Sequence, residues 1–515
     1  MPFPRQISRA PFFSRLLAKR VGNQPTAPFP RVFILALTAL CLFASGCKPV
    51  GPDYSRPAYN APSAYKETGA PSVVPPPNPQ GGTWNSANPS DGMIRGKWWE
   101  VYGDSQLNQL ENRIEGNNYA LHQAAENYLA ARDQVAAVRS TLFPTLSGTA
   151  GFTHNQNSHN KPLTTPTSKT SYNDMILGGV GSWEPDFWGR IRRNIEASQA
   201  SAQASAADLA NVTLSLQGEM AADYFQLRGL DSQIRLLRAT VTDLERQLDL
   251  TQRRLKGGVS TAVDVEQAQT QLETVRAQLV DLNVGRAQFE HAVGTIANYN
   301  LPEFNIPYSP LDLALPRVPI GVPSQLLERR PDIASAERQT AAANARIGIA
   351  VSAYYPTISL GGTGGFESTH IGTLFQGPSA FWALGGQATE LLFDAGQRHA
   401  LTDQARQQHE AQAAAYRNTV IQAFQDVEDN LSSLRILDQE AAVEQNAVAA
   451  AQRSFNLSNQ RYKGGVTSYL EVLTAEATLI SDQRTLTDLQ TRQFAASVQL
   501  IRALGGGWDV TQLPK

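Results

Sequence analysis

The chain has 515 residues, a formal net charge of −2 and a pI near 6.4, so its charge gives no indication of a nucleic-acid partner. Its two cysteines, Cys41 and Cys47, both lie in the first 47 residues, which leaves the rest of the chain without thiols for a disulfide framework. The seven histidines show no HExxH spacing, and no GxSxG sequence is present. We therefore expect neither an enzyme nor a site for a metal or a cofactor.

The first 46 residues are typical of a secretory signal. Basic residues and no acidic ones precede the apolar run 32–44, which is too short to span a membrane as a helix. The segment ends in ASGC at 44–47, which resembles the lipoprotein box of bacterial lipoproteins. We therefore predict that Cys47 becomes the lipidated first residue of the mature chain. In such lipoproteins an aspartate in the next position signals retention in the inner membrane, so Lys48 indicates the outer membrane.

Residues 47–100 are predicted to form an extended, lipidated tether, because 48–90 are rich in proline, serine, asparagine and glycine. A helical pattern follows from a predicted N-cap at Asp104 to about Ser140. Proline then ends the helix, and PTLSGTAGF at 144–152 has the pattern of a strand. After a polar loop at 153–175, a second strand is predicted at about 176–187.

A very long helix is predicted after Gly189. No proline occurs from there to Lys256, and apolar residues between 230 and 248 are spaced by fours and threes. Such a helix would be about 100 Å long, which indicates a coiled coil or a tall bundle. A plain two-helix hairpin in solvent remains the alternative. Gly257 and Gly258 can end the helix in a turn, and a return helix is predicted from about 262 to 297.

The second half of the chain repeats the first. RLKGGVS at 254–260 recurs as RYKGGVT at 461–467, an offset of 207 residues that also relates Gly189 to Gly396. We therefore assign repeat 1 to 101–300, a linker to 301–324, repeat 2 to 325–505 and a tail to 506–515. Repeat 2 is predicted to contain strands near 356–366 and 381–393, a helix over about 397–460, a turn at Gly464 and Gly465, and a return helix over 469–504.

Four strands per chain are too few to close a barrel. Open sheet edges in lipid would leave backbone groups unpaired, and the smallest single-chain barrels have about eight strands. A chain with four strands must therefore pool them with copies of itself under cyclic symmetry. Three chains would give a twelve-stranded β-barrel in the membrane, continuous with a long periplasmic barrel of helical hairpins.

Several segments resemble the outer membrane factor family, the TolC/OprM-like channel lipoproteins of the NodT group. They are VGPDY at 50–54, the tryptophan pair at 98–99, WEPD at 183–186, both RxxGG turns, and VPIGVPSQLLERRPDI at 318–333 with Ala336 and Glu337 after it. The resemblance covers essentially the whole mature chain. It implies a homotrimer that passively conducts small molecules out of the cell, together with a periplasmic adaptor and an inner-membrane transporter of the RND type. In the last of these segments we expect Arg329, Arg330 and Glu337 to form ion pairs across the repeats.

The resemblance also implies a gate at the periplasmic tip, built from apolar and acidic rings just after the hairpin turn. By position these rings fall at Leu470 and Thr474. Because Thr474 is not acidic, Glu471 and its counterpart Asp264 are the nearest acidic candidates. Alternatively, both carboxylates are solvated groups that favour a helix start.

Two other functions remain open. The same fold would serve as the exit channel of type I protein secretion. A periplasmic coiled-coil adaptor or scaffold lipoprotein is the alternative of another class, but such an adaptor would carry a lipoyl-like domain in place of two strand hairpins.

Overall fold

The computed structural model describes residues 48–514, except 63, 69–95, 159–169 and 319–322. The signal at 1–46 and the predicted lipid anchor Cys47 lie outside the described residues. The helices are α2 (Ser105–Asn117), α3 (Tyr119–Ser140), α4 (Arg190–Lys256), α5 (Ala262–Ile296), α6 (Leu326–Arg329), α7 (Pro331–Ser352), α8 (Gln397–Lys463) and α9 (Tyr469–Ala503). The strands are β1 (Thr145–Gln156), β2 (Ser171–Trp183), β3 (Thr357–Ser368) and β4 (Ala380–Thr389). Short 3-10 turns include η1 (Lys66–Thr68) and η3 (Trp98–Tyr102).

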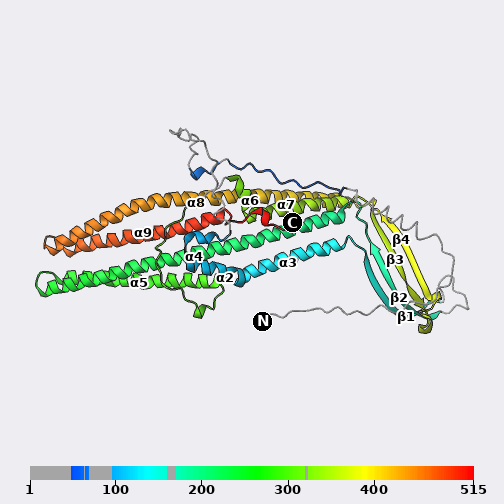
Figure 1. Cartoon of the computed structure of the whole chain (residues 1–515), viewed down its shortest axis with the longest axis horizontal. Helices are drawn as coiled ribbons and strands as arrows, with labels where there is room; N and C mark the ends of the chain where they lie inside the picture. The colour runs from blue at the N-terminus through cyan, green and yellow to red at the C-terminus, as the bar shows by residue number, and fades with distance from the viewer. Residues whose placement is uncertain (1–47, 63, 69–95, 159–169, 319–322, 515) are drawn as a thin grey trace. The chain divides into compact units, whose positions relative to one another are not determined.

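Two long helical hairpins form most of this architecture. The α4 and α8 helices have 67 residues each, so each rises about 100 Å, and the return helices α5 and α9 have 35 residues each. The long helices expected from the proline-free, periodic segments are confirmed. Because α4 packs on α9 as well as on α5, the two hairpins lie side by side (Figure 1).

The four strands form one antiparallel sheet in the order β1-β2-β3-β4, so the central pair joins the first half of the chain to the second (Figure 1). The expected combination of long helices with two strand hairpins is confirmed. The predicted loop at 153–175 was too long, since pairing continues to Gln156 and Ser171. Polar side chains are tolerated there because they are exposed, and His154 Nδ1 lies 2.7 Å from Asn173 Oδ1. The fourth strand ends at Thr389, four residues earlier than predicted.

The helix predicted from Asp104 to Ser140 is in fact two helices. Asp104 is its N-cap as expected, since it accepts hydrogen bonds from the backbone of Gln106 and Leu107. Asn118 then interrupts the run with ψ of 124° and accepts from the backbone amides of Ala120 and Leu121. The asparagine side chain therefore acts as a second N-cap that competes with helix continuation.

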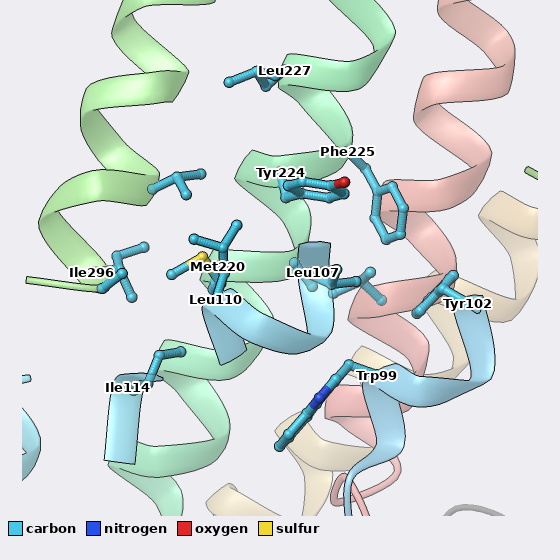
Figure 2. Close-up of a cluster of buried hydrophobic side chains, with 14 of the residues drawn as sticks. Trp99, Tyr102, Leu107, Leu110, Ile114, Met220, Tyr224, Phe225, Leu227 and Ile296 are labelled. Atoms are coloured by element: carbon cyan, nitrogen blue, oxygen red, sulfur yellow. The ribbon is translucent and has the colours of Figure 1, made fainter. Parts of the chain in front are cut away.

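The main core lies where η3 and α2 meet α4, α5 and α9. Tyr102, Phe225 and Phe494 pack as an aromatic cluster, with ring centroids 4.7 Å apart for Tyr102 and Phe225 and 4.9 Å apart for Phe225 and Phe494. Figure 2 shows Trp99 and Tyr102 beside α2 and α4, and both residues belong to the same buried cluster as the side chains of these helices. The tether predicted for 47–100 therefore does not extend to residue 100, because Trp98–Tyr102 belongs to the core.

The described part of the predicted tether that precedes residue 69 is also fixed in place. Arg193 of α4 binds the carbonyls of Val50 and Gly51 and the carboxylate of Asp53. Further along, the Glu428 carboxylate of α8 accepts from the backbone of Lys66 and Glu67. The segment is thus a strap along α4, α7 and α8, and its polar composition concealed the many fixed partners of its backbone.

The linker between the two halves is tied to hairpin α4–α5 by buried charges. Asp231, fully buried, accepts from Arg228 Nη1 at 3.1 Å, Arg286 Nε at 2.7 Å and the Ser309 amide at 3.0 Å. The two arginines also bind the carbonyls of Pro307 and Ile306. Such a network fixes the linker, because each buried charge has several partners.

The ion pairs predicted across the repeats differ in the structure. Arg330 pairs with Asp332 and with Asp426 of α8, all within the second half, while Glu337 binds Arg338 and the hydroxyl of Tyr54. Within this segment, Arg338 does reach the first repeat, since its Nη1 donates to Gln203 of α4 at 3.3 Å. For Arg330 and Glu337 the prediction was wrong, because Pro331 starts α7 and Arg330 lies against Asp426 of α8.

Candidate functional site

The sheet has one apolar face and one that is mainly small and polar. Side chains alternate along a strand, so the pairing register assigns every residue to a face. One face carries mainly apolar side chains from all four strands: Leu146, Ala150, Phe152, Met175, Leu177, Leu360, Phe366, Trp382 and Leu384. The other face of β1 carries threonine and serine at 145, 147, 149 and 153. Leu146 is 85% exposed and Trp382 is 76% exposed, so much of the apolar face has no cover within the described chain.

The strands and the hairpin turns lie at opposite ends of the long helices along the chain. Strand β2 leads into the start of α4, and β4 leads into the start of α8, while each helix ends at a glycine pair. Gly258 and Gly465 both have φ of +74°. Val259 and Val466 donate back to the carbonyls of Arg254 and Arg461, each at 2.9 Å. The two tips therefore share the Schellman type of helix ending that the glycine pairs predict.

The return helices start differently at the two tips. Thr261 and Asp264 form a reciprocal capping box, and Ser260 also donates to the Asp264 carboxylate at 2.8 Å. Burial raises the pKa of Asp264, but these hydrogen bonds and the charge of Arg254 outweigh it, so the pKa is lowered overall. In the second tip Ser468 forms no capping bond through its side chain. Asp264 therefore helps to start its helix, whereas Glu471, in the equivalent position, has an exposed side chain.

Contacts between the two hairpins hold the tips together. The guanidinium carbon of Arg254 lies 4.5 Å from the ring centroid of Tyr462, and Arg254 Nη1 donates to the Lys463 carbonyl at 3.3 Å. The hydroxyls of Ser260 and Tyr462 lie 3.4 Å apart. Tyr462 in turn packs against the buried ring of Tyr469, with centroids 5.3 Å apart. The sequence analysis did not single out this cluster, although the change from Leu255 to Tyr462 between the repeated turns marks it.

The residues predicted for the gate lie on the first turns of the return helices. Leu470 is 54% exposed, and Glu471 and Thr474 are also exposed on α9. The Thr474 hydroxyl donates to the Leu470 carbonyl at 2.8 Å within that helix. Asp264 is bound in its capping box on α5 and reaches Tyr462 through Ser260. The structure therefore brings Asp264 into the tip cluster and leaves the three α9 side chains at the surface.

Within the described ranges there is no cluster of histidine, cysteine, aspartate and glutamate suited to hold a metal ion. Over the same residues, none of the helices combines the length and the hydropathy needed to cross a bilayer.

Comparisons with known proteins agree with this architecture. The model of the family described as "Outer membrane efflux protein" matches residues 110–298 and 322–506. The probable efflux pump outer membrane protein TtgC of Pseudomonas putida is 31% identical over 479 residues, which cover 92% of this chain and 96% of the relative. The pyoverdine export outer membrane protein OpmQ of Pseudomonas aeruginosa is 30% identical over 429 residues, covering 82% of this chain and 90% of the relative.

A solved structure agrees as well. The outer-membrane channel OprN superposes with a TM-score of 0.80 at 27% identity, and the match covers 89% of this chain and 99% of OprN. Family, sequence relatives and fold are thus consistent over nearly the whole described chain. The chain belongs to the outer membrane efflux protein family, and it is an efflux channel protein of the outer membrane.

Proposed function

We propose that three copies of the chain form one closed exit duct, which passively carries small molecules from a periplasmic adaptor and an inner-membrane RND-type transporter to the exterior. The duct performs no chemistry of its own and holds no cofactor; its energy comes from the transporter. The observation that carries this proposal is the sheet with one exposed apolar face, joined through α4 and α8 to the paired tips.

The edges of the sheet support a trimer. Among the described residues, β1 pairs only with β2 and β4 only with β3, so each chain offers two open edges. In lipid each unpaired backbone group costs several kcal/mol, so the edges must meet edges of other chains. Cyclic symmetry closes such an arrangement, and three chains give a barrel of twelve strands whose apolar face contacts lipid. The same symmetry arranges the hairpins into a helical cylinder.

The gate of this duct is proposed at the tips. Leu470, Glu471 and Thr474 lie exposed at the start of α9, where copies related by symmetry would bring them into rings. Since Asp264 is committed to its capping box, Glu471 is the more available acid. The contacts of Arg254 and Ser260 with Tyr462 would hold the closed state.

The partners follow from the ends of the molecule. The tips present Val259 and Val466, 68% and 69% exposed, and we propose that these apolar side chains meet the adaptor. We further propose that a lipid on Cys47 anchors the strap to the outer membrane. Small-molecule cargo is supported by the export of pyoverdine that the name of OpmQ states.

Deletion of the gene tests the function. Cells without the chain should become more susceptible to several exported compounds, and the wild-type gene should restore resistance. The purified protein should also cross-link as a trimer and form channels in planar bilayers. Unchanged susceptibility across a broad panel, together with loss of a secreted protein, would instead support type I protein secretion.

A further inference from the structure

A buried carboxyl group lies in the contact between the two hairpins, close to the tips. Glu476 of α9 is 4% exposed, and its Oε1 accepts from Gln247 Nε2 of α4 at 2.7 Å. The other oxygen, Oε2, has no hydrogen-bond partner among the described residues. The carboxyl group thus lies in a narrow site that offers it one donor, where a negative charge is poorly compensated.

Gln247 connects α4 to two successive parts of α9. Its Nε2 binds Glu476, while its Oε1 accepts from the hydroxyl of Tyr469 at 3.4 Å. Tyr469 is buried against Tyr462, which carries the Arg254 contact at the tip. The buried carboxyl group is therefore linked through one amide and two rings to the contacts that hold the hairpins together.

The surroundings of Glu476 disfavour its ionisation, chiefly through burial. Burial raises its pKa to about 7, the hydrogen bond from Gln247 opposes this, and the charge of Asp243 on α4 adds to it. Asp243 is itself paired with Arg246 at the surface. Burial raises the pKa of neighbouring Tyr469, and Tyr462 of α8 and Asp264 of α5 raise it further.

We propose that Glu476 is a proton-controlled latch between the hairpins: the neutral acid holds the tips closed, and loss of its proton loosens the α4–α9 contact. This regulation rests on the tip gate proposed above. When the hairpins separate, water reaches the carboxyl group and its pKa returns toward the ordinary value near 4.5. Opening then releases a proton, so the closed state is favoured in acid and the open state gains as the pH rises toward and through 7.

The pH dependence of channel opening tests this latch. In planar bilayers the open population should rise between pH 5.5 and pH 7.5, because one carboxyl group with these two pKa values raises the opening equilibrium constant of each contact about twentyfold. Glu476→Gln keeps the shape of the neutral acid and should stay mostly closed with a nearly flat profile. Asp488→Asn, at an exposed carboxylate on the same helix and away from the proposed gate, should keep the wild-type profile.

A second measurement follows the hairpins directly. Nitroxides on cysteines replacing Val263 and Leu470 should report longer distances at pH 7.5 than at pH 5.5 in the wild-type background, and unchanged distances with Glu476→Gln. A flat wild-type profile, or a Glu476→Gln variant that keeps the wild-type pH response, overturns the latch.

A variant without the tip contact distinguishes a wrong latch from a wrong duct. Arg254→Ala with Tyr462→Leu removes the tip contact and should conduct at every pH. If this variant conducts while the wild type shows no pH response, the latch alone is wrong. If it does not conduct at all, the proposed duct is wrong.

Discussion

Arg254 of the first hairpin lies over the ring of Tyr462 of the second, with 4.5 Å between the guanidinium carbon and the ring centroid. Such a contact contributes about 0.5–1 kcal/mol. Arg254→Ala should therefore raise the open population several-fold, because about 1 kcal/mol corresponds to roughly a factor of five. Single-channel recording in planar bilayers measures this population.

Arg253→Ala is the matched control for that variant. Arg253 is exposed and pairs with Asp249 on its own helix, so its loss should leave the tip contact intact. An equal increase in opening for Arg253→Ala and Arg254→Ala would mean that general loss of positive charge, and not the contact with Tyr462, controls the tip.

Gly258 should tolerate substitution far less well than Gly257. Gly258 has φ of +74°, where an L side chain costs about 1–2 kcal/mol. A Cβ on Gly257 would meet the carbonyls of Arg253 and Arg254 at 3.5 and 3.6 Å, which are ordinary contacts. Hydrogen exchange of amides 254–266 should speed up about five- to thirtyfold in Gly258→Ala and little in Gly257→Ala. Equal rates in the two variants would show that the turn adopts another conformation in solution.

The sequence indicated the long helices and the tips well, because their signals are local. Proline-free periodicity defines α4 and α8, and a glycine pair ends each. Contacts between segments that are far apart along the chain have no comparable local pattern in the sequence. The strap at 49–68 is polar in composition, yet Arg193, 140 or more residues away along the chain, fixes its backbone.

The sequence predicted where the candidate site lies, but not which side chains meet in it. Repetition of RxxGG located both tips, and Asp264 was correctly placed at a helix start. Glu476 and Gln247, however, resemble ordinary residues on the polar part of a helix. Only packing of α9 against α4 shows that their side chains meet in a buried site.

Replacement of Asp231 should lower the free energy of unfolding strongly. Asp231→Ala leaves the buried Arg228 and the half-buried Arg286 without their shared carboxylate, and removal of one partner of a buried ion pair costs about 3–5 kcal/mol. Asp312→Ala removes a partner of Arg235 that is exposed, so its cost should stay below about 1 kcal/mol. Denaturant titration in detergent compares the two. Similar losses for both variants would contradict the buried network around the linker.

Cys47 is predicted to carry the lipid. Cys47→Ser should abolish incorporation of labelled palmitate into the protein, while Cys41→Ser, within the predicted signal, should leave it unchanged. Labelling that persists in Cys47→Ser would show that the anchor assignment is wrong.

Glu111 should make the protein less stable as the pH rises. It is fully buried on α2, and neither carboxylate oxygen has a hydrogen-bond partner among the described residues. Burial holds the pKa of Glu111 well above its ordinary value near 4.5 in the folded chain. The folded state therefore binds a proton that the unfolded state releases, and its stability falls as the pH rises from about 4.5 toward the folded pKa.

Glu111→Gln removes this titration. Its stability should match the wild type near pH 5 and exceed it by about 1–3 kcal/mol near pH 8, where wild-type folding must either keep the proton or bury a charge. Denaturant titration at the two pH values gives the difference. Glu115→Gln, an exposed neighbour on the same helix, should behave as the wild type at both. The raised pKa of Glu476 also makes the wild type less stable as the pH rises. In Glu111→Gln the free energy of unfolding should therefore still fall with pH, but less steeply. A Glu111→Gln variant that is destabilised equally at pH 5 and pH 8 would show that the carboxyl group has a partner in the assembled protein.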